Sequence, residues 1–152
     1  MNAPQLIPIR ICSSHKSDVK AGFLNEIYTE HMLRAFFKAF DRQGYAVLSR
    51  KLGICLSSER HENYGDWEEK GDAQILAMLK EQAKNPAFEG VTWIYWNHRP
   101  LTHAKWVRML VEAGFKVIER RTLGEIAALL AGSKPAMTLD SWGTGRSQEV
   151  EG

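Results

Sequence analysis

The predicted fold is decided by the stretch Tyr45-Ala46-Val47-Leu48-Ser49-Arg50-Lys51-Leu52-Gly53-Ile54. Its apolar half does not alternate with polar residues, which is typical of a central strand covered on both faces. The strand stops at Ser49, and two cations, Arg50 and Lys51, follow in a loop with Gly53. In an open parallel sheet, ligands bind in the crevice beyond the carboxyl ends of the strands. The stretch therefore predicts the middle of a sheet and one wall of a site, although Arg50 and Lys51 are also explained as solvated surface charges.

On either side of this stretch, the apolar patterns predict three more strands and four helices. The strands are expected at residues 6–12, 91–96 and 115–119, and the helices at 23–40, 67–83, 104–113 and 123–130. Asp66 and Thr102 are placed to cap the second and third helices. Residues 54–59 form either an edge extension of the sheet or an excursion from it. The order of elements predicts an α/β fold, a three-layer sandwich with a mainly parallel four-stranded sheet.

Length and composition indicate one soluble domain. The chain has 152 residues, of which 44% are hydrophobic and 25% charged, as in ordinary globular proteins. We expect one domain at residues 1–132 and a flexible tail at 133–152, anchored at most by Trp142. No stretch approaches the length of a membrane span, and the N-terminus does not resemble a signal peptide, so a cytoplasmic protein without a membrane partner is expected. The oligomeric state is not predicted.

Three polar loops follow predicted strands. They contribute Ser14 and Lys16, Ser49 and Lys51, and the run Asn97-His98-Arg99. Because the carboxyl ends of parallel strands meet at one edge of the sheet, the two ammonium groups are expected to share a crevice and to favour an anion. This arrangement predicts a phosphate-bearing ligand.

The cysteine and histidine patterns argue against metal and thiol chemistry. The loop after Cys12 carries Asp18 where a tyrosine-phosphatase loop needs arginine, so a small buried thiol is favoured over a nucleophile. His98 and His103 are separated by a proline, and the other histidines fall in separate elements, which matches no zinc spacing. We expect no metal and no cofactor.

Several segments resemble a known family. Cys12 and Lys16 follow the first strand, Ile27-Tyr28-Thr29 lies in the first helix, and the central strand ends in Leu48-Ser49-Arg50-Lys51-Leu52-Gly53-Ile54, with Asn63-Tyr64-Gly65-Asp66 downstream. Together these segments resemble small phage and bacterial α/β domains with a Leu-Ser-Ala-Lys-x-Gly-Leu strand end and a Pro-Tyr-Asp turn. The resemblance covers most of residues 6–130.

The resemblance implies a distant relationship to the uracil-DNA glycosylase fold and to enzymes that exchange or modify nucleobases. It implies that the pocket is lined by Lys16, Tyr28, Ser49, Lys51, Tyr64 and Asp66. Arg50 stands where that family has a small residue, and Gly65 interrupts the Tyr-Asp pair. An inactive descendant therefore remains an alternative.

Two functional hypotheses follow. The first is an enzyme acting on a nucleotide or nucleic acid at an N-glycosidic bond, in which Asp66 activates water, Tyr64 stacks on the base, and the lysines bind phosphate. Asn97 or His98 would contact the base. The second is a noncatalytic module that binds a nucleotide or a protein. Binding of DNA through a basic surface is a weaker third possibility, because the net charge is only +2 and the cations are spread along the chain.

Overall fold

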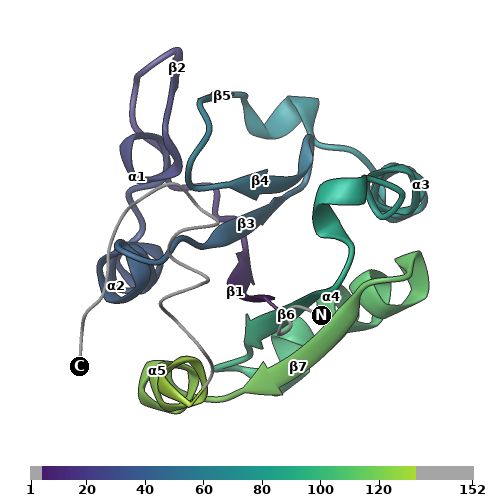
Figure 1. Ribbon diagram of the computed structural model, residues 1–152. Coiled ribbons are helices and arrows are strands. Elements are labelled where there is room, and N and C mark those ends of the chain that lie inside the picture. The colour runs from purple at the N-terminus through teal and green to yellow at the C-terminus, as the bar shows by residue number, and fades with distance from the viewer. Residues whose placement is uncertain (1–4, 133–152) are drawn as a thin grey trace.

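A five-stranded sheet forms the centre of the protein, whose computed structural model describes residues 5–132 (Figure 1). In spatial order the strands are β4 (Gly53–Leu56), β3 (Ala46–Ser49), β1 (Gln5–Ile11), β6 (Val91–Trp96) and β7 (Lys116–Arg120). The pairs β3–β1, β1–β6 and β6–β7 are parallel, and β3–β4 is antiparallel. This confirms the predicted α/β class and mainly parallel sheet, but the sheet has five strands rather than four.

The additional strand is β4, for which the sequence left two alternatives open. Gly53 has a φ of 78° and lets the chain turn back directly after Ser49, so that Leu48 pairs with Ile54. Gln82 supports the new strand, because its Oε1 accepts from the Ile54 N–H at 2.8 Å. The edge extension is therefore correct.

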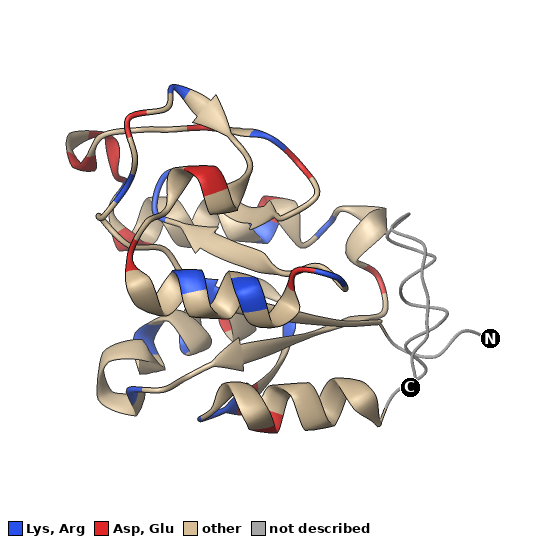
Figure 2. Ribbon diagram, turned by 90° about the vertical axis from the view of Figure 1, so that its left-hand side faces the viewer, with Lys and Arg blue, Asp and Glu red and all other residues tan. Residues whose placement is uncertain are grey.

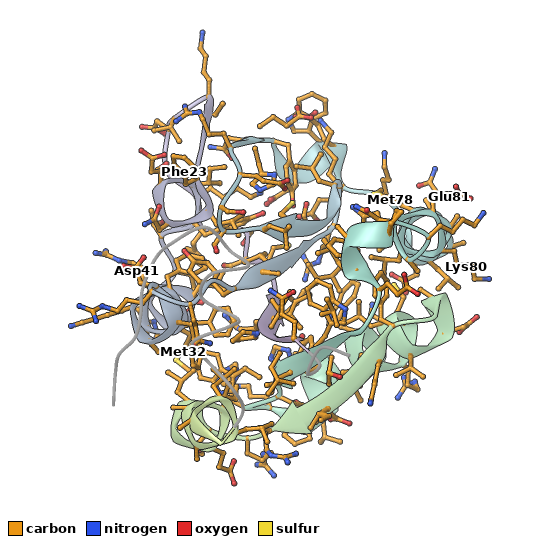
Figure 3. The ribbon with its side chains drawn as sticks, in the orientation of Figure 1. Phe23, Met32, Asp41, Met78, Lys80 and Glu81 are labelled. Atoms are coloured by element: carbon orange, nitrogen blue, oxygen red, sulfur yellow. The ribbon has the colours of Figure 1, made fainter. Side chains whose placement is uncertain are left out.

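Helices cover both faces of the sheet. In Figure 1, α2 (His31–Phe40) and α5 (Leu123–Ala131) lie on one side, and α3 (Asp72–Gln82) and α4 (Pro100–Ala113) lie on the other. Side chains from both layers fill the space against the strands, whereas Lys80 and Glu81 project away from the core (Figure 3). All six residues of β6 are buried, which explains its unbroken apolar run. The three-layer sandwich is confirmed.

The long helix expected at residues 23–40 is wrong. The structure has a short α1 (Leu24–Ile27) and then α2, separated by the extended Tyr28. Tyr28 forms an isolated antiparallel bridge with Lys16, and the Thr29 N–H donates to the His15 carbonyl at 3.0 Å. Glu30 then begins α2 by accepting from the N–H groups of residues 32 and 33. Pairing with a distant loop has overridden the helical periodicity.

Two other helices begin elsewhere than expected. Residues 67–83 are divided into a 3₁₀ turn, η1 (Asp66–Glu68), and α3, so Asp66 lies inside a turn and does not cap a helix. Thr102 does not cap α4, which begins at Pro100 with Arg99 as its N-cap residue. Proline at the first helical position is favourable because its missing N–H would have no helical partner there.

Smaller elements complete the described part of the chain. A two-stranded ribbon pairs β2 (Ala21–Gly22) with β5 (His61–Glu62), and a second 3₁₀ turn, η2 (Pro86–Phe88), precedes β6. No helix within residues 5–132 is long and apolar enough to cross a membrane. The predicted tail at 133–152, with Trp142, lies outside the described residues.

Candidate functional site

The buried hydroxyl of Tyr64 is the centre of a polar cluster. Tyr64 is 4% exposed, and its Oη accepts from Ser49 Oγ at 2.8 Å. It donates to Cys12 Sγ at 3.7 Å and lies 3.4 Å from the Tyr28 hydroxyl. Burial raises the pKa of Tyr64, so the hydroxyl stays protonated and acts as a structural donor and acceptor.

The strand ends hold this cluster in place. Ser49 is the last residue of β3, and its Oγ accepts from the N–H groups of Lys51 and Leu52 at 3.1 and 3.0 Å. Cys12 follows β1 and donates its N–H to the Leu48 carbonyl at 2.9 Å. The carboxyl ends of β1 and β3 therefore lie side by side, as expected for parallel neighbours.

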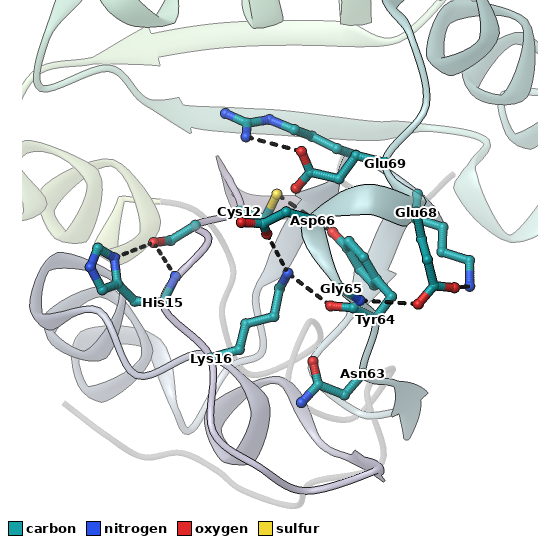
Figure 4. A network of polar contacts seen from close by, with 12 residues as sticks. Cys12, His15, Lys16, Asn63, Tyr64, Gly65, Asp66, Glu68 and Glu69 are labelled. Atoms are coloured by element: carbon teal, nitrogen blue, oxygen red, sulfur yellow. Dashed lines mark hydrogen bonds and ion pairs between the residues drawn. The ribbon is translucent and has the colours of Figure 1, made fainter.

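Lys16 and Lys51 both lie near the ring of Tyr64, and Figure 4 shows Lys16 beside it. The Nζ of Lys16 is 4.1 Å from the ring centroid and donates to the Tyr64 carbonyl at 3.1 Å. The Nζ of Lys51 is 5.9 Å from the same centroid. Both distances lie within the range of cation–π attraction. The structure thus brings the two predicted lysines to one aromatic residue.

Carboxylates already neutralise these lysines. Lys16 pairs with Asp66 at 3.5 Å, and Lys51 pairs with Glu68 at 2.7 Å and with Glu62 at 3.1 Å. The hydrogen bond from Lys51 and the N–H of Gly65 lower the pKa of Glu68, so this carboxylate is ionised at neutral pH. Two ammonium groups therefore face three carboxylates. An incoming anion has to compete with these acids, which the count of lysines alone did not reveal.

An open pocket of about 460 Å³ lies beside the cluster. Its lining consists of Ser14, Lys16, Ser17, Asp18, Val19, Lys20, Asn63, Tyr64, Gly65 and Asp66. The side chain of Lys16 is 6% exposed, whereas that of Asp66 is 65% exposed. Asp66 thus presents a carboxylate to solvent at the pocket, and the ion pair with the buried ammonium group of Lys16 holds this carboxylate in place. Ser14, Lys16, Tyr64 and Asp66 are brought together as expected, with Tyr28, Ser49 and Lys51 contacting Tyr64.

Asn97, His98 and Arg99 are not part of this pocket lining. Asn97 is 2% exposed and its Nδ2 donates to Glu119 at 2.7 Å. The ring of His98 packs 4.7 Å from Trp96, and burial lowers the pKa of His98. Arg99 begins α4. These residues follow β6 as predicted, but Asn97 and His98 contact other parts of the protein, and Asn97 Oδ1 and His98 Nδ1 are buried without a hydrogen-bond partner.

The structure also changes the expected part played by Tyr64. Its ring is buried and an ammonium group lies over it, so a base cannot stack on the ring in the observed arrangement. Tyr64 instead supports Lys16 and the ends of β1 and β3. Its hydroxyl is occupied by Ser49, and its carbonyl by Lys16.

Cys12 is a buried thiol, 4% exposed, whose Sγ accepts a hydrogen bond from the Tyr64 hydroxyl. Burial raises its pKa, which the N–H of Arg50 offsets only in part. A protonated, enclosed thiol is a poor nucleophile. The sequence-based preference for a small buried thiol is therefore correct.

Sequence reasoning missed several acidic partners and an aromatic residue. Arg50 pairs with Glu69 at 3.5 Å, and Glu68 joins Lys51 to η1. Trp67, expected as the first residue of a helix, is 86% exposed at the centre of η1. No local spacing connects Lys51 with a glutamate 17 residues away, because the ion pair depends on the tertiary fold. Trp67 could have been found from the sequence, since it is a large aromatic residue that directly follows the predicted site residue Asp66.

Within residues 5–132 no group of three histidine, cysteine, aspartate or glutamate side chains is placed to hold a metal ion. Comparison with known proteins adds no relative: no family model matches the chain, and neither the curated proteins nor the solved structures contain a significant match.

Proposed function

We propose that this protein is an enzyme that acts on a nucleotide at the N-glycosidic bond, in the pocket beside Tyr64. The observation that carries the proposal is the exposed Asp66 carboxylate, held 3.5 Å from the buried ammonium of Lys16 in a pocket of about 460 Å³. Pockets of this size accommodate small organic ligands. The resemblance to small phage and bacterial α/β domains, which implies a distant relationship to nucleobase-modifying enzymes, supports the same substrate class.

The chemistry assigns Asp66 the role of general base. Water attacks C1′ of the sugar, the bond to the base nitrogen breaks, and its electron pair leaves with the base. The proton of the attacking water passes to Asp66, and a further proton from solvent reaches the departing base. A carboxylate beside the sugar also stabilises the cation-like transition state. Lys16 keeps the carboxylate in position and supplies a positive charge for a phosphate oxygen.

A small nucleotide fits the surface charges better than a duplex does. Figure 2 shows acidic and basic residues interspersed over the described chain rather than gathered into one basic face. Duplex binding relies on a field of Lys and Arg that neutralises several phosphates. The balanced charges therefore favour a free nucleotide as the substrate.

The experiment measures free base released from a panel of ribonucleoside and deoxyribonucleoside 5′-monophosphates by liquid chromatography. Asp66→Asn should lower the rate by about 10²- to 10⁴-fold, the usual contribution of a general base, while calorimetry shows retained binding. Asp41→Asn, at the end of α2, is the control and should leave the rate unchanged. Nucleotide binding without any base release would contradict the catalytic proposal.

The charge balance of the cluster favours a second candidate, a noncatalytic nucleotide-binding protein. Lys51 is held by two carboxylates and Tyr64 is enclosed, so much of the cluster is stable without a substrate. Under this alternative, Asp66→Asn leaves both nucleotide affinity and biological activity intact. If the intact protein binds no nucleotide, both candidates are wrong.

A further inference from the structure

Trp67 is the one described tryptophan that lies in solvent. It is 86% exposed, whereas Trp93, Trp96 and Trp106 are 1%, 4% and 5% exposed. An indole left in water forgoes a large gain from burial, and exposed tryptophans are enriched where a partner or ligand covers them. The exposure of Trp67 therefore requires an explanation, whereas the three buried tryptophans are explained by their place in the core.

The backbone beneath Trp67 is held at both of its ends. Asp66 pairs with the buried Lys16 at 3.5 Å, and Glu68 pairs with Lys51 at 2.7 Å. Glu68 also accepts from the Gly65 N–H at 3.0 Å, which closes the turn. The two lysines of the site thus hold η1, whose first residue, Asp66, lines the pocket and is followed directly by Trp67.

The indole packs against Gly65, which lines the pocket, while Trp67 itself lies next to the pocket lining rather than in it. A Cβ at Gly65 would overlap the indole nitrogen of Trp67, so residue 65 has space for hydrogen alone on that side. Gly65 and Asp66 both line the pocket. The glycine that interrupts the Tyr-Asp pair therefore lets the indole pack against the backbone of residue 65, one residue before the exposed Asp66.

We infer that Trp67 is the aromatic surface on which the base of the bound nucleotide stacks. This inference rests on the proposed function and names the part of the substrate that the site recognises. Tyr64 cannot serve, because its ring is buried beneath Lys16. Stacking accepts every base, since each has a π face. The site therefore distinguishes phosphates that carry a base from phosphates that do not.

Calorimetry on the full chain tests the inference with the four ribonucleoside 5′-monophosphates and with ribose 5-phosphate. Trp67→Ala should weaken nucleotide binding by roughly 5- to 150-fold, the range for loss of one base–aromatic stack. Binding of ribose 5-phosphate should not change. Trp67→Phe should restore most of the affinity, and Gly65→Ala, which displaces the indole without removing it, should give an intermediate loss. Leu101→Ala, a truncation of an apolar side chain 99% exposed on α4, is the control.

The outcomes separate this inference from the proposed function. Trp67→Ala could weaken nucleotide binding no more than Leu101→Ala does, while Lys16→Met abolishes it. In that case the stacking role is wrong and the assignment of the pocket remains. If Trp67→Ala weakens the binding of nucleotides and of ribose 5-phosphate equally, Trp67 only supports η1, and the inference is overturned as well. Failure of the intact protein to bind any nucleotide would overturn the proposed function and this inference together.

Discussion

At the scale of single residues, the hydroxyl of Tyr64 connects the strand ends to the site. It bonds Ser49 at 2.8 Å and Cys12 at 3.7 Å inside the protein. Tyr64→Phe removes these bonds and leaves the Ser49 hydroxyl without its acceptor. A buried polar group that loses its partner costs about 1–3 kcal/mol, so the free energy of unfolding, measured in urea, should fall by that amount.

The matched control removes a neighbouring buried hydroxyl instead. Tyr28→Phe removes only a weaker contact with Tyr64, at 3.4 Å, and should cost less than Tyr64→Phe. Equal stability losses would contradict the assignment of Tyr64 as the centre of the cluster.

At the scale of elements, a buried histidine joins α4 to β6. Nδ1 of His103 lies 2.8 Å from the Tyr95 hydroxyl, and the residue is 2% exposed. Burial, with smaller contributions from Arg10, His98 and Arg99, lowers the pKa of His103 to about 4. In the unfolded chain a histidine has a pKa of about 6.5. The neutral imidazole therefore belongs to the folded state.

This shift makes stability depend on pH. Between the two pKa values the unfolded chain binds more protons than the folded protein, so stability is complete above pH ~6.5 and declines as the pH falls toward ~4. The total loss from His103 is up to roughly 3 kcal/mol. Urea unfolding at pH 7.5 and pH 5 should show this decline, and His103→Gln should reduce it. A decline in stability that is the same in His103→Gln as in the unmodified protein would contradict the account.

The turn between β3 and β4 provides a second test at this scale. Gly53 has a positive φ, and a Cβ there would overlap the Gln82 side chain that supports β4. Gly90 has nearly the same φ, 80°, but nothing lies within 4 Å of its Cβ position. Gly90→Ala should cost about 1–2 kcal/mol from backbone strain alone. Gly53→Ala should cost distinctly more in thermal or urea unfolding, and similar losses would show that the Gln82 contact is unimportant.

At the scale of the whole molecule, the strands were predictable because their signal is local. The unbroken runs around Val47 and Ile94 are those of strands buried on both faces, and both are 0% exposed. The break near Tyr28 was not predictable, since apolar spacing continues through it and its cause is pairing with Lys16. The same loop carries the site. Local patterns fail where a contact between distant segments decides the conformation.

The position of the candidate site could be predicted from the sequence, but the acidic partners of its lysines could not. Parallel strands bring Lys16 and Lys51 to one edge of the sheet, as the sequence indicates. The acids that neutralise them, Glu62 and Glu68, arrive from a ribbon and a turn whose placement depends on the complete fold. The enzyme hypothesis also assigned stacking of the base to Tyr64, because burial of a ring cannot be read from the sequence of a turn.

Both candidate functions require a nucleotide to bind in the pocket beside Tyr64. An amide chemical-shift titration of the isotope-labelled full chain with adenosine 5′-monophosphate tests this binding. We expect the largest shift changes at Lys16, Gly65 and Asp66, where the pocket is lined. Changes that are absent at these amides, or that are largest in the loop at residues 97–99, would contradict the account.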